Sequence, residues 1–450
     1  MPKKLRMVLA GWLLPGIVVL SLGGCGKQVE HKEPVTLVLS SITFSLALNR
    51  GDRDILPDFT KKTGIAVNLL PYGTEDMGAR RIQHLAWLKD HSATPDVYEM
   101  DIVDVATLAP YGLNLDPYVP DANQEYMHSI LRNLTYQGHL IALPNQTDIG
   151  LLFYRTDLLK KYGYKHPPKT WDELEKMAAR IQAGERAAGD ANFWGFVWEG
   201  SPQNEGLTYT ALEWQTSNGG GHIIEPDGSI TVDNPWAIAA FRRARKWVGT
   251  ISPPAVTAYQ MEDLSNAWLS GRAAFMRNWP YYYSLGQSAD SASKGKFDVA
   301  PLPAGLEGPA GTLGGWQLLV SAYSAHPKEA VELAKYLSSR EIQLRISREF
   351  SYMPSRPELY DDPQILQANP YFQWLKGDFE KLAVPRPSGP AGEKYLAVAD
   401  AYKQSVHKIL TGEEDAGESM AELEQELARI TGLPVRHPSN PIPVSPPLSQ

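Results

Sequence analysis

The feature that most restricts the fold of this chain is the alternation of short apolar runs with amphipathic stretches between Val35 and Asp101. Residues 35–39, 65–70 and 95–101 predict strands, and helix patterns occupy residues 49–62, which end before Gly64, and residues 80–89. This β-α-β-α-β order predicts a parallel sheet. Ligands bind beyond the carboxyl ends of such strands, so the residues expected at the ligand edge are Ser40, Ser41, Tyr72 and Asp101.

A second informative stretch covers residues 143–159, where polar side chains give way to an apolar run and then to a helix-like sequence. Residues 151–154 predict a strand buried on both faces. We interpret this stretch as the passage from one lobe into another, which would turn Asn145, Gln146 and Asp148 toward a cleft. An ordinary loop-to-strand junction with solvated polar residues would account for the same sequence.

The remainder of the chain continues the α/β pattern. Thr170 and Glu173 form a capping box that predicts a helix with Leu174, Met177, Ala178 and Ile181 on one face. Residues 297–303 predict a second crossing, residues 311–320 a strand entered through glycines, and residues 392–410 and 416–431 the last helices. Beyond Pro434 the chain is rich in Pro and Ser, which predicts disorder for residues 434–450.

The N-terminus has the pattern of an export signal. Lys3, Lys4 and Arg6 precede an apolar run over residues 7–22, and small residues stand directly before Cys25, the only cysteine. This ending resembles a bacterial lipobox, so we expect residues 1–24 to be removed, Cys25 to be lipidated and residues 25–34 to form a tether. An uncleaved membrane helix is the alternative. The cleavage would change the formal charge from −8 to −11, which argues against a nucleic-acid partner.

Several motifs occur together in one order. After the lipoprotein-like start come Thr-Asp-Ile-Gly-Leu-Leu-Phe-Tyr-Arg-Thr-Asp-Leu-Leu at 147–159, Thr-Trp-Asp-Glu-Leu at 170–174, Gly-Arg-Ala-Ala-Phe-Met-Arg-Asn-Trp-Pro at 271–280 and Gly-Gly-Trp at 314–316. With these motifs the chain resembles, over about residues 35–431, the family 1 extracellular solute-binding proteins of bacterial ABC sugar importers. Within that family it is most similar to the trehalose- and maltose-binding type.

The resemblance implies a two-lobe periplasmic-binding-protein fold of type II. Each lobe would be a mainly parallel sheet flanked by helices, and crossing hinge segments would join the lobes. The N-terminal lobe would comprise residues 35–146 and 302–352, and the C-terminal lobe residues 147–301 and 353–433.

The resemblance also implies a ligand site with contributions from both lobes. Its residues would be Arg81, Asp101, Asn145, Gln146, Asp148, Glu205, Trp279, Gly314, Gly315 and Arg386. Asp148 matches the sugar-binding acid of the family and Trp279 its stacking tryptophan. Gln146 stands where several relatives have an aromatic residue, which would alter the choice of sugar.

The chemistry of these residue types suits a sugar, which needs paired donors and acceptors for its hydroxyl groups and aromatic planes for its C–H faces. Trp279, Trp316, Trp198 and Tyr72 could supply the planes. Trp198 and Trp316 could equally be core residues, Glu205 a solvated acid and Arg81 a helix-surface residue. Gly314 and Gly315 could be simple turn positions.

These observations predict a binding protein, with no enzymatic activity, cofactor or metal. It would be a monomer, lipid-anchored to the cell membrane and facing the periplasm or exterior, that delivers a disaccharide or short oligosaccharide, trehalose or a maltose-like α-glucoside, to an ABC permease. One alternative is a protein of the same build for a non-sugar solute, such as ferric ion, a polyamine or a phosphate ester. A less favoured alternative is an exported glycoside hydrolase, which would use two carboxylates across a sugar cleft.

Overall fold

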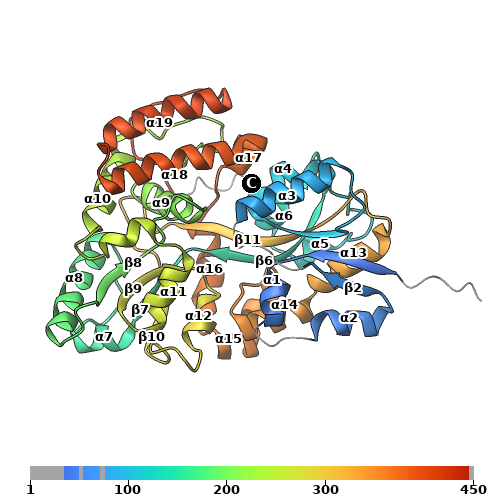
Figure 1. Ribbon diagram of the computed structural model, residues 1–450, viewed down its shortest axis with the longest axis horizontal. Helices are drawn as coiled ribbons and strands as arrows, with labels where there is room; N and C mark the ends of the chain where they lie inside the picture. Colours follow the sequence, from blue (N-terminus) through green and yellow to red (C-terminus); the bar gives the residue numbers. More distant parts are fainter. Residues whose placement is uncertain (1–34, 50–53, 71–76, 445–450) are drawn as a thin grey trace, which may run out of the picture. The chain divides into compact units, whose positions relative to one another are not determined.

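The computed structural model describes residues 35–49, 54–70 and 77–444, which form two α/β lobes that share two long strands (Figure 1). The predicted signal peptide, Cys25, the tether over residues 25–34 and Tyr72 lie outside the described residues. None of the helices in the described ranges has the length and apolar character that a membrane crossing requires.

The first lobe is built on a sheet with the order β12-β11-β3-β1-β2, in which β6 also pairs with β11. Its strands are β1 (Thr36–Ser40), β2 (Ala66–Leu69), β3 (Val97–Asp101), β6 (Ala142–Ile149), β11 (Gly311–Val320) and β12 (Ala383–Val384). β1 is parallel to β2 and β3, as the predicted β-α-β-α-β order requires. β11 is antiparallel to both β3 and β6, because it carries the chain back from the second lobe.

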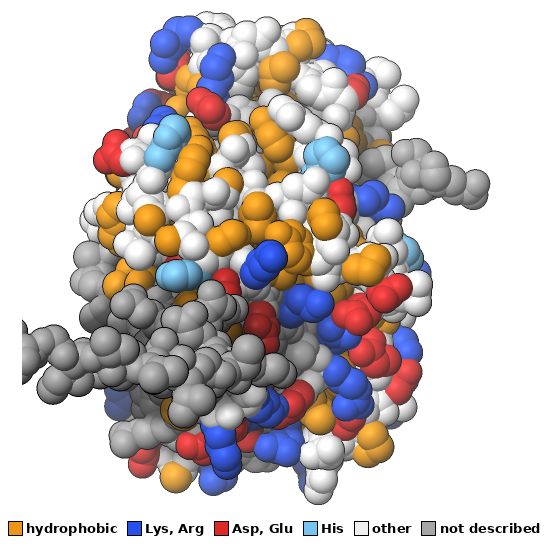
Figure 2. Space-filling model, turned by 90° about the vertical axis from the view of Figure 1, so that its right-hand side faces the viewer, with side chains coloured by type: hydrophobic (Ala, Val, Ile, Leu, Met, Phe, Trp, Pro, Cys, Tyr) orange, Lys and Arg blue, Asp and Glu red, His pale blue; other side chains and the backbone are white. Residues whose placement is uncertain are grey.

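The helices and short elements of this lobe surround one apolar core from residues 37–143 and 318–352. They are α1 (Thr43–Asn49), α2 (Ile55–Thr63), α3 (Met77–Lys89), η1 (Ile102–Asp104), α4 (Val105–Leu108), η2 (Ala109–Tyr111), α5 (Ala122–Glu125), α6 (His128–Asn133), β4 (Thr135–Tyr136), β5 (His139–Leu140), α13 (Pro327–Leu337) and α14 (Arg340–Phe350). α2 ends at Gly64, whose φ of 78° is the left-handed conformation that glycine favours at a helix end. On the face of this lobe in Figure 2, basic and acidic side chains lie interspersed.

The second lobe has a four-stranded sheet with the order β10-β7-β9-β8. Its strands are β7 (Leu151–Arg155), β8 (Trp194–Val197), β9 (Ala273–Asn278) and β10 (Phe297–Pro301). β7 is antiparallel to β9 and β10, and only β8 and β9 form a parallel pair. The expectation of a mainly parallel sheet is therefore wrong for this lobe. The reason is that β7 brings the chain into the lobe and β10 returns it, so these neighbouring strands run in opposite directions.

The second core combines residues of this lobe from both sides of the crossings. Its helices are α7 (Thr156–Lys161), α8 (Trp171–Ala187), α9 (Gly206–Ser217), α10 (Pro235–Trp247), η3 (Pro254–Ala258), α11 (Met261–Leu269), α12 (Tyr282–Gly286), η4 (Pro357–Asp361), α15 (Pro363–Ala368), α16 (Phe372–Leu382), α17 (Ser388–Ala391), η5 (Gly392–Lys394), α18 (Tyr395–Thr411) and α19 (Ala416–Thr431). α8 begins where predicted, with the Thr170 hydroxyl accepting a hydrogen bond from the Glu173 amide at 3.2 Å. The Glu173 carboxylate accepts from the amide of Lys169, one residue before the predicted partner.

The two lobes are joined by strands that belong to both. β6 and β11 run side by side from one lobe toward the other (Figure 1), paired from Leu319 with Ala142 to Leu313 with Ile149. Ile149 and Leu313, at one end of this ribbon, belong to the core of the second lobe, whereas Leu143 and Leu318 belong to the core of the first. The change from one core to the other thus occurs within the two strands.

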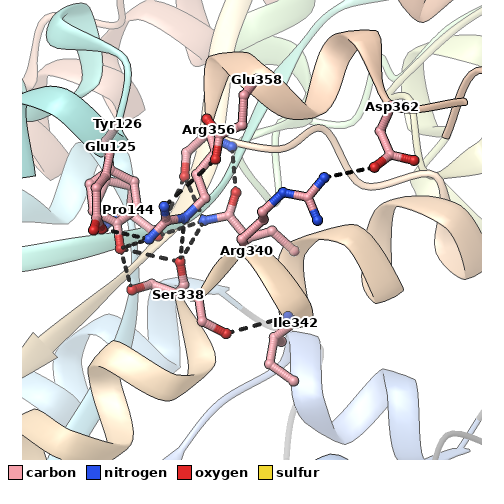
Figure 3. Close-up of polar contacts among 12 residues, drawn as sticks. Glu125, Tyr126, Pro144, Ser338, Arg340, Ile342, Arg356, Glu358 and Asp362 are labelled. Carbon is pink, nitrogen blue, oxygen red and sulfur yellow. Dashed lines mark hydrogen bonds and ion pairs between the residues drawn. The ribbon is translucent and has the colours of Figure 1, made fainter. Parts of the chain in front are cut away.

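The chain returns to the second lobe after Tyr352, and this third crossing is fastened to the first lobe by buried polar contacts (Figure 3). The Arg356 guanidinium donates to the Ser338 carbonyl at 3.1 Å, to the Tyr126 hydroxyl at 3.0 Å and to the Glu125 carboxylate at 2.7 Å. The Thr147 amide donates to the Met353 carbonyl at 3.0 Å. The three crossings therefore lie together, as a hinge region requires.

The C-terminal segment differs from its prediction. Disorder was expected for residues 434–450, but residues 434–444 lie against the second lobe. The Ile230 amide donates to the Pro434 carbonyl at 2.9 Å, and the Ile442 amide donates to the Gly219 carbonyl at 2.8 Å. Val444 is buried in the second core. Backbone hydrogen bonds and a few apolar contacts hold this Pro-rich segment, and a composition-based prediction does not take them into account.

Candidate functional site

The candidate site lies where β3, β6 and β11 reach the second lobe. Trp316 on β11 is in register with Asp101 on β3 and with Gln146 on β6. Two residues away, Gly314 is in register with Asp148. Strand pairing therefore brings together predicted site residues from three distant parts of the sequence.

Charged side chains of both lobes meet at the end of β3. Arg386 follows β12, a strand that extends the first-lobe sheet but packs Val384 into the second core. Arg386 donates to the Asp101 carboxylate at 2.8 Å and to the Glu205 carboxylate at 3.4 Å. Glu205 stands at the start of α9 and also accepts a hydrogen bond from the Tyr395 hydroxyl at 2.8 Å. From α3 of the first lobe, Arg81 lies 3.7 Å from Glu205. Two ion pairs, Arg386–Asp101 and Arg81–Glu205, thus connect the lobes.

This cluster is largely withdrawn from water. The side chains of Arg81 and Arg386 are each 3% exposed, and those of Asp101 and Glu205 are 15% and 14% exposed. Burial by itself lowers the pKa of Arg386. The negative charge of Asp101, together with Tyr395 and Glu205, raises the pKa by more than burial lowers it, so the pKa of Arg386 lies above its usual range. Both arginines therefore stay charged, and both are held in position by carboxylates.

A second cluster surrounds Trp279, which directly follows β9. The Arg277 guanidinium lies 4.1 Å from the Trp279 ring centre and 4.4 Å from that of Tyr209. Glu213 on α9 accepts hydrogen bonds from Arg277 at 2.9 and 2.5 Å, and both side chains are almost fully buried. The Tyr209 and Trp279 rings meet edge to face with centres 4.9 Å apart. The indole is therefore fixed by a buried ion pair on one side and an aromatic ring on another.

Asp148 and Gly314 adjoin this indole. A Cβ atom on Gly314 would lie 3.0 Å from Trp279 Cζ3 and 3.1 Å from Asp148 Cβ, so the absence of a side chain lets the indole and Asp148 pack closely against β11. Burial raises the pKa of Asp148 well above its usual value, Arg277 lowers it, and Asp101 raises it again. A carboxyl group with a raised pKa keeps its proton to a higher pH, and in its protonated form it donates as well as accepts a hydrogen bond.

Buried polar atoms without a hydrogen-bond partner among the described residues gather in this region, although such atoms are generally satisfied in folded proteins. They include Asp148 Oδ1, Gln146 Oε1, Thr147 Oγ1, Arg277 Nη1, Arg386 Nε and Arg81 Nη2. Donors and acceptors of both lobes and of the crossing strand are thus available to a polar ligand.

Some predicted site residues have other surroundings. The Asn145 amide donates to Glu99 at 2.8 Å inside the first lobe, and Glu99 also accepts from the amides of Ile42 and Thr43. Trp198 is fully buried and donates to Ser252 at 3.1 Å, which makes it a core residue. Trp316 remains half-buried, with the Arg80 guanidinium 4.6 Å from its ring centre.

The backbone conformation explains why a glycine occupies position 315. Its φ is 124°, and a Cβ atom would lie 2.6 Å from the Gln146 carbonyl oxygen. This glycine therefore allows β11 to approach β6 closely beside Trp316.

Five residues of the two clusters were not predicted: Asp104, Tyr209, Glu213, Arg277 and Tyr395. Arg277 lies two positions before Trp279 in the same sequence motif. This nearness in sequence was the only signal that could have indicated its role. Asp104, which pairs with Arg81, and the other three lie on helices whose patterns show burial but do not identify a partner. Their roles depend on contacts between elements far apart in the sequence.

Two α/β lobes joined by crossing strands, with charged and aromatic groups of both lobes at the junction, define a two-lobe periplasmic binding protein. Comparisons with known proteins agree with this class. Residues 49–344 match the family model of the bacterial extracellular solute-binding proteins. The chain therefore belongs to this family, and the predicted family and two-lobe fold are confirmed.

Three relatives illustrate the relationship. A probable ABC transporter-binding protein of Deinococcus radiodurans is 45% identical over 83% of this chain and 89% of its own length. The maltose-bound structure of T. maritima MalE3 is 33% identical, with a TM-score of 0.81 over 88% of this chain and all of that one. The galactooligosaccharide-binding protein of Bacillus subtilis is 23% identical over 91% of this chain and 94% of its own. All three are named as binding proteins or were solved with a bound solute.

Proposed function

We propose that this protein is the lipid-anchored substrate-binding component of an ABC sugar importer. It would bind a disaccharide or short oligosaccharide between its lobes and deliver it to the permease. The observation that carries the proposal is the arrangement of Trp279, Gly314 and Asp148, in which an indole held by Arg277 packs against a glycine and lies beside a buried carboxyl group.

This arrangement supports a sugar because it offers both kinds of contact that a pyranose needs. The indole supplies a flat apolar surface for ring C–H groups, and Asp148 supplies a hydrogen-bonding group at its edge. Asp101, Glu205 and Arg386 supply further groups that are already oriented by ion pairs, which reduces the entropy lost on binding. A neutral polyhydroxylated ligand can use these groups without breaking the ion pairs.

The division of the site between lobes supports ligand-linked closure. Asp101 and Arg81 belong to the first lobe, and Glu205, Arg386 and Trp279 to the second. A ligand that contacts both sets binds the closed form more tightly and shifts the population toward it. The proposed ligand is trehalose or a maltose-like α-glucoside, which the motif resemblance and the 33% identity to a maltose-bound protein support.

The experiment is thermal unfolding of the purified protein with trehalose, maltose, other disaccharides, monosaccharides, Fe³⁺ and polyamines. A ligand at about 100 times its dissociation constant should add roughly 2.7 kcal/mol to the free energy of unfolding. Trp279→Ala and Asp148→Ala should abolish the shift. Trp236→Ala is the matched control, because this half-buried tryptophan lies on α10 away from both clusters. A shift with a cation or amine, and with no sugar, would contradict the sugar proposal and leave the fold intact.

The same sugar panel distinguishes binding from hydrolysis. A binding protein should leave each disaccharide intact after prolonged incubation, as monitored by chromatography of the products. Release of monosaccharides at a rate that Asp148→Ala abolishes would instead support a glycoside hydrolase.

The anchor is tested separately, since it depends on Cys25. Cells that express the full chain with labelled palmitate should yield a labelled protein in the membrane fraction. Cys25→Ser should lose the label, and retention of label in this variant would contradict the lipobox interpretation.

A further inference from the structure

Three potential metal ligands meet at the surface of the second lobe, outside the candidate site. They are Asp233 just before α10, Glu424 on α19 and His437 in the C-terminal segment, and one ligand atom of each lies within 4.8 Å of the others. The backbone holds His437 in this place, because the Arg436 amide donates to the Ile230 carbonyl at 2.8 Å. In the described parts of the chain, no other trio of His, Cys, Asp or Glu comes this close together.

Glu424 is the residue that indicates a ligand. It is 6% exposed, and its Oε1 atom is buried without a hydrogen-bond partner among the described residues. This atom lies 3.7 Å from His437 Nδ1, which is too long for a hydrogen bond. A buried carboxylate beside a second acid is costly unless a cation compensates it.

We propose that Asp233, Glu424 and His437 bind a divalent first-row metal ion, for which Zn²⁺ is the best match. One imidazole nitrogen with two carboxylate oxygens suits Zn²⁺, whereas Ca²⁺ and Mg²⁺ prefer oxygen ligands alone. Two ligand atoms at about 2.1 Å from a metal can be at most about 4.2 Å apart. The 3.7 Å between Glu424 and His437 satisfies this limit. The separation of up to 4.8 Å within the trio requires a closing movement of at most about 0.6 Å, for which His437, whose side chain is 66% exposed, has room.

The ion would connect three segments that are far apart in the sequence: the residues before α10, the middle of α19 and the C-terminal segment. Three protein ligands leave one tetrahedral position for water. The site would therefore hold the C-terminal segment on the second lobe, and this inference does not depend on the proposed sugar-binding function.

The test is isothermal titration calorimetry of Zn²⁺ into the protein, purified with a tag that contains no histidine. One Zn²⁺ per chain should bind to the unmodified protein and to His166→Ala, which removes an exposed histidine elsewhere in the same lobe. His437→Ala and Glu424→Gln should each weaken binding at least tenfold. Co²⁺ should give a visible absorption spectrum that both variants lose, and Mg²⁺ should not compete.

A structural consequence provides a second measurement. Zn²⁺ should slow proteolytic cleavage around residue 437, and it should do so less in His437→Ala, which changes a side chain that is 66% exposed. Absence of a stoichiometric Zn²⁺ site, or a site that His437→Ala and Glu424→Gln leave unchanged, would overturn the proposal. Binding of Ca²⁺ in preference to Zn²⁺ would also overturn it.

Discussion

The pH dependence of stability should reveal the buried carboxyl group of Glu199, a neighbour of Tyr209, whose ring packs against Trp279. Glu199 is 2% exposed and accepts a hydrogen bond from the Tyr209 hydroxyl. Burial raises its pKa from 4.5 to about 7, an effect that outweighs the opposing influence of the Tyr209 hydrogen bond and the Arg277 charge. The folded protein therefore retains a proton on Glu199 that the unfolded chain releases near pH 4.5.

The sign and size follow from this difference. Between pH 4.5 and about 7 the folded state binds more protons at Glu199 than the unfolded state, so the free energy of unfolding falls as pH rises. The stabilisation is fully present below this window and lost above it. At about 1.36 kcal/mol per pH unit, the full difference is roughly 3 kcal/mol, of which about 2 to 3 kcal/mol falls between about pH 5 and pH 8.

Glu199→Gln isolates this effect, because glutamine keeps the size and an acceptor for Tyr209 but does not titrate. Urea unfolding of both proteins between about pH 5 and pH 8 measures their difference in free energy. As the pH rises over this range, the free energy of unfolding of the variant should increase by about 2 to 3 kcal/mol relative to that of the unmodified protein. Glu332→Gln, on the exposed face of α13, is the matched control and should show no such trend. A difference that stays constant over this range would refute the reasoning.

Three further predictions concern the residues around the junction. Glu213→Gln leaves the Arg277 charge buried without its partner and should lower the free energy of unfolding by about 3 to 5 kcal/mol in urea titrations. The exposed Lys62–Glu341 pair is the comparison, since Glu341→Gln should cost less than about 1 kcal/mol. Gly315→Ala should lower the melting temperature, because an alanine held at the φ of 124° carries about 1 to 3 kcal/mol of backbone strain. An unchanged melting temperature would contradict the close strand approach. Arg386→Met should weaken sugar binding about tenfold or more in calorimetry, and unchanged affinity would exclude a role for the cross-lobe ion pairs in closure.

Local patterns in the sequence predicted the elements whose burial is periodic. The β-α-β-α-β order of residues 35–101 is present in the structure with parallel β1, β2 and β3. The helix after Thr170 begins at the predicted residue because its cap involves neighbouring residues. Strand register then brought Asp101, Asp148 and Gly314 to one region, and their part in ligand binding stays a prediction.

Local sequence patterns did not predict the direction of one strand or the partner of one site residue. The direction of β10 against β7 depends on how the chain re-enters the hinge, and no local pattern encodes it. Asn145 was expected at the site beside Asp148, but the structure pairs it with Glu99. A polar residue on a buried strand contacts whichever group packs against its face of the sheet, and the local sequence does not identify that group.

The sequence by itself therefore determined the class of protein and the order of the elements around the first crossing, whereas the ligand-binding roles of its aromatic and acidic residues stay predictions. The tertiary structure decided how those residues are supported. Glu213 and Arg277 are 64 positions apart, and Arg386 and Asp101 are 285 apart. Hydrophobic periodicity reports only whether a side chain is buried. The partner of a buried charge is set by the packing of distant elements, and that partner determines whether the charge stabilises the fold or binds a ligand.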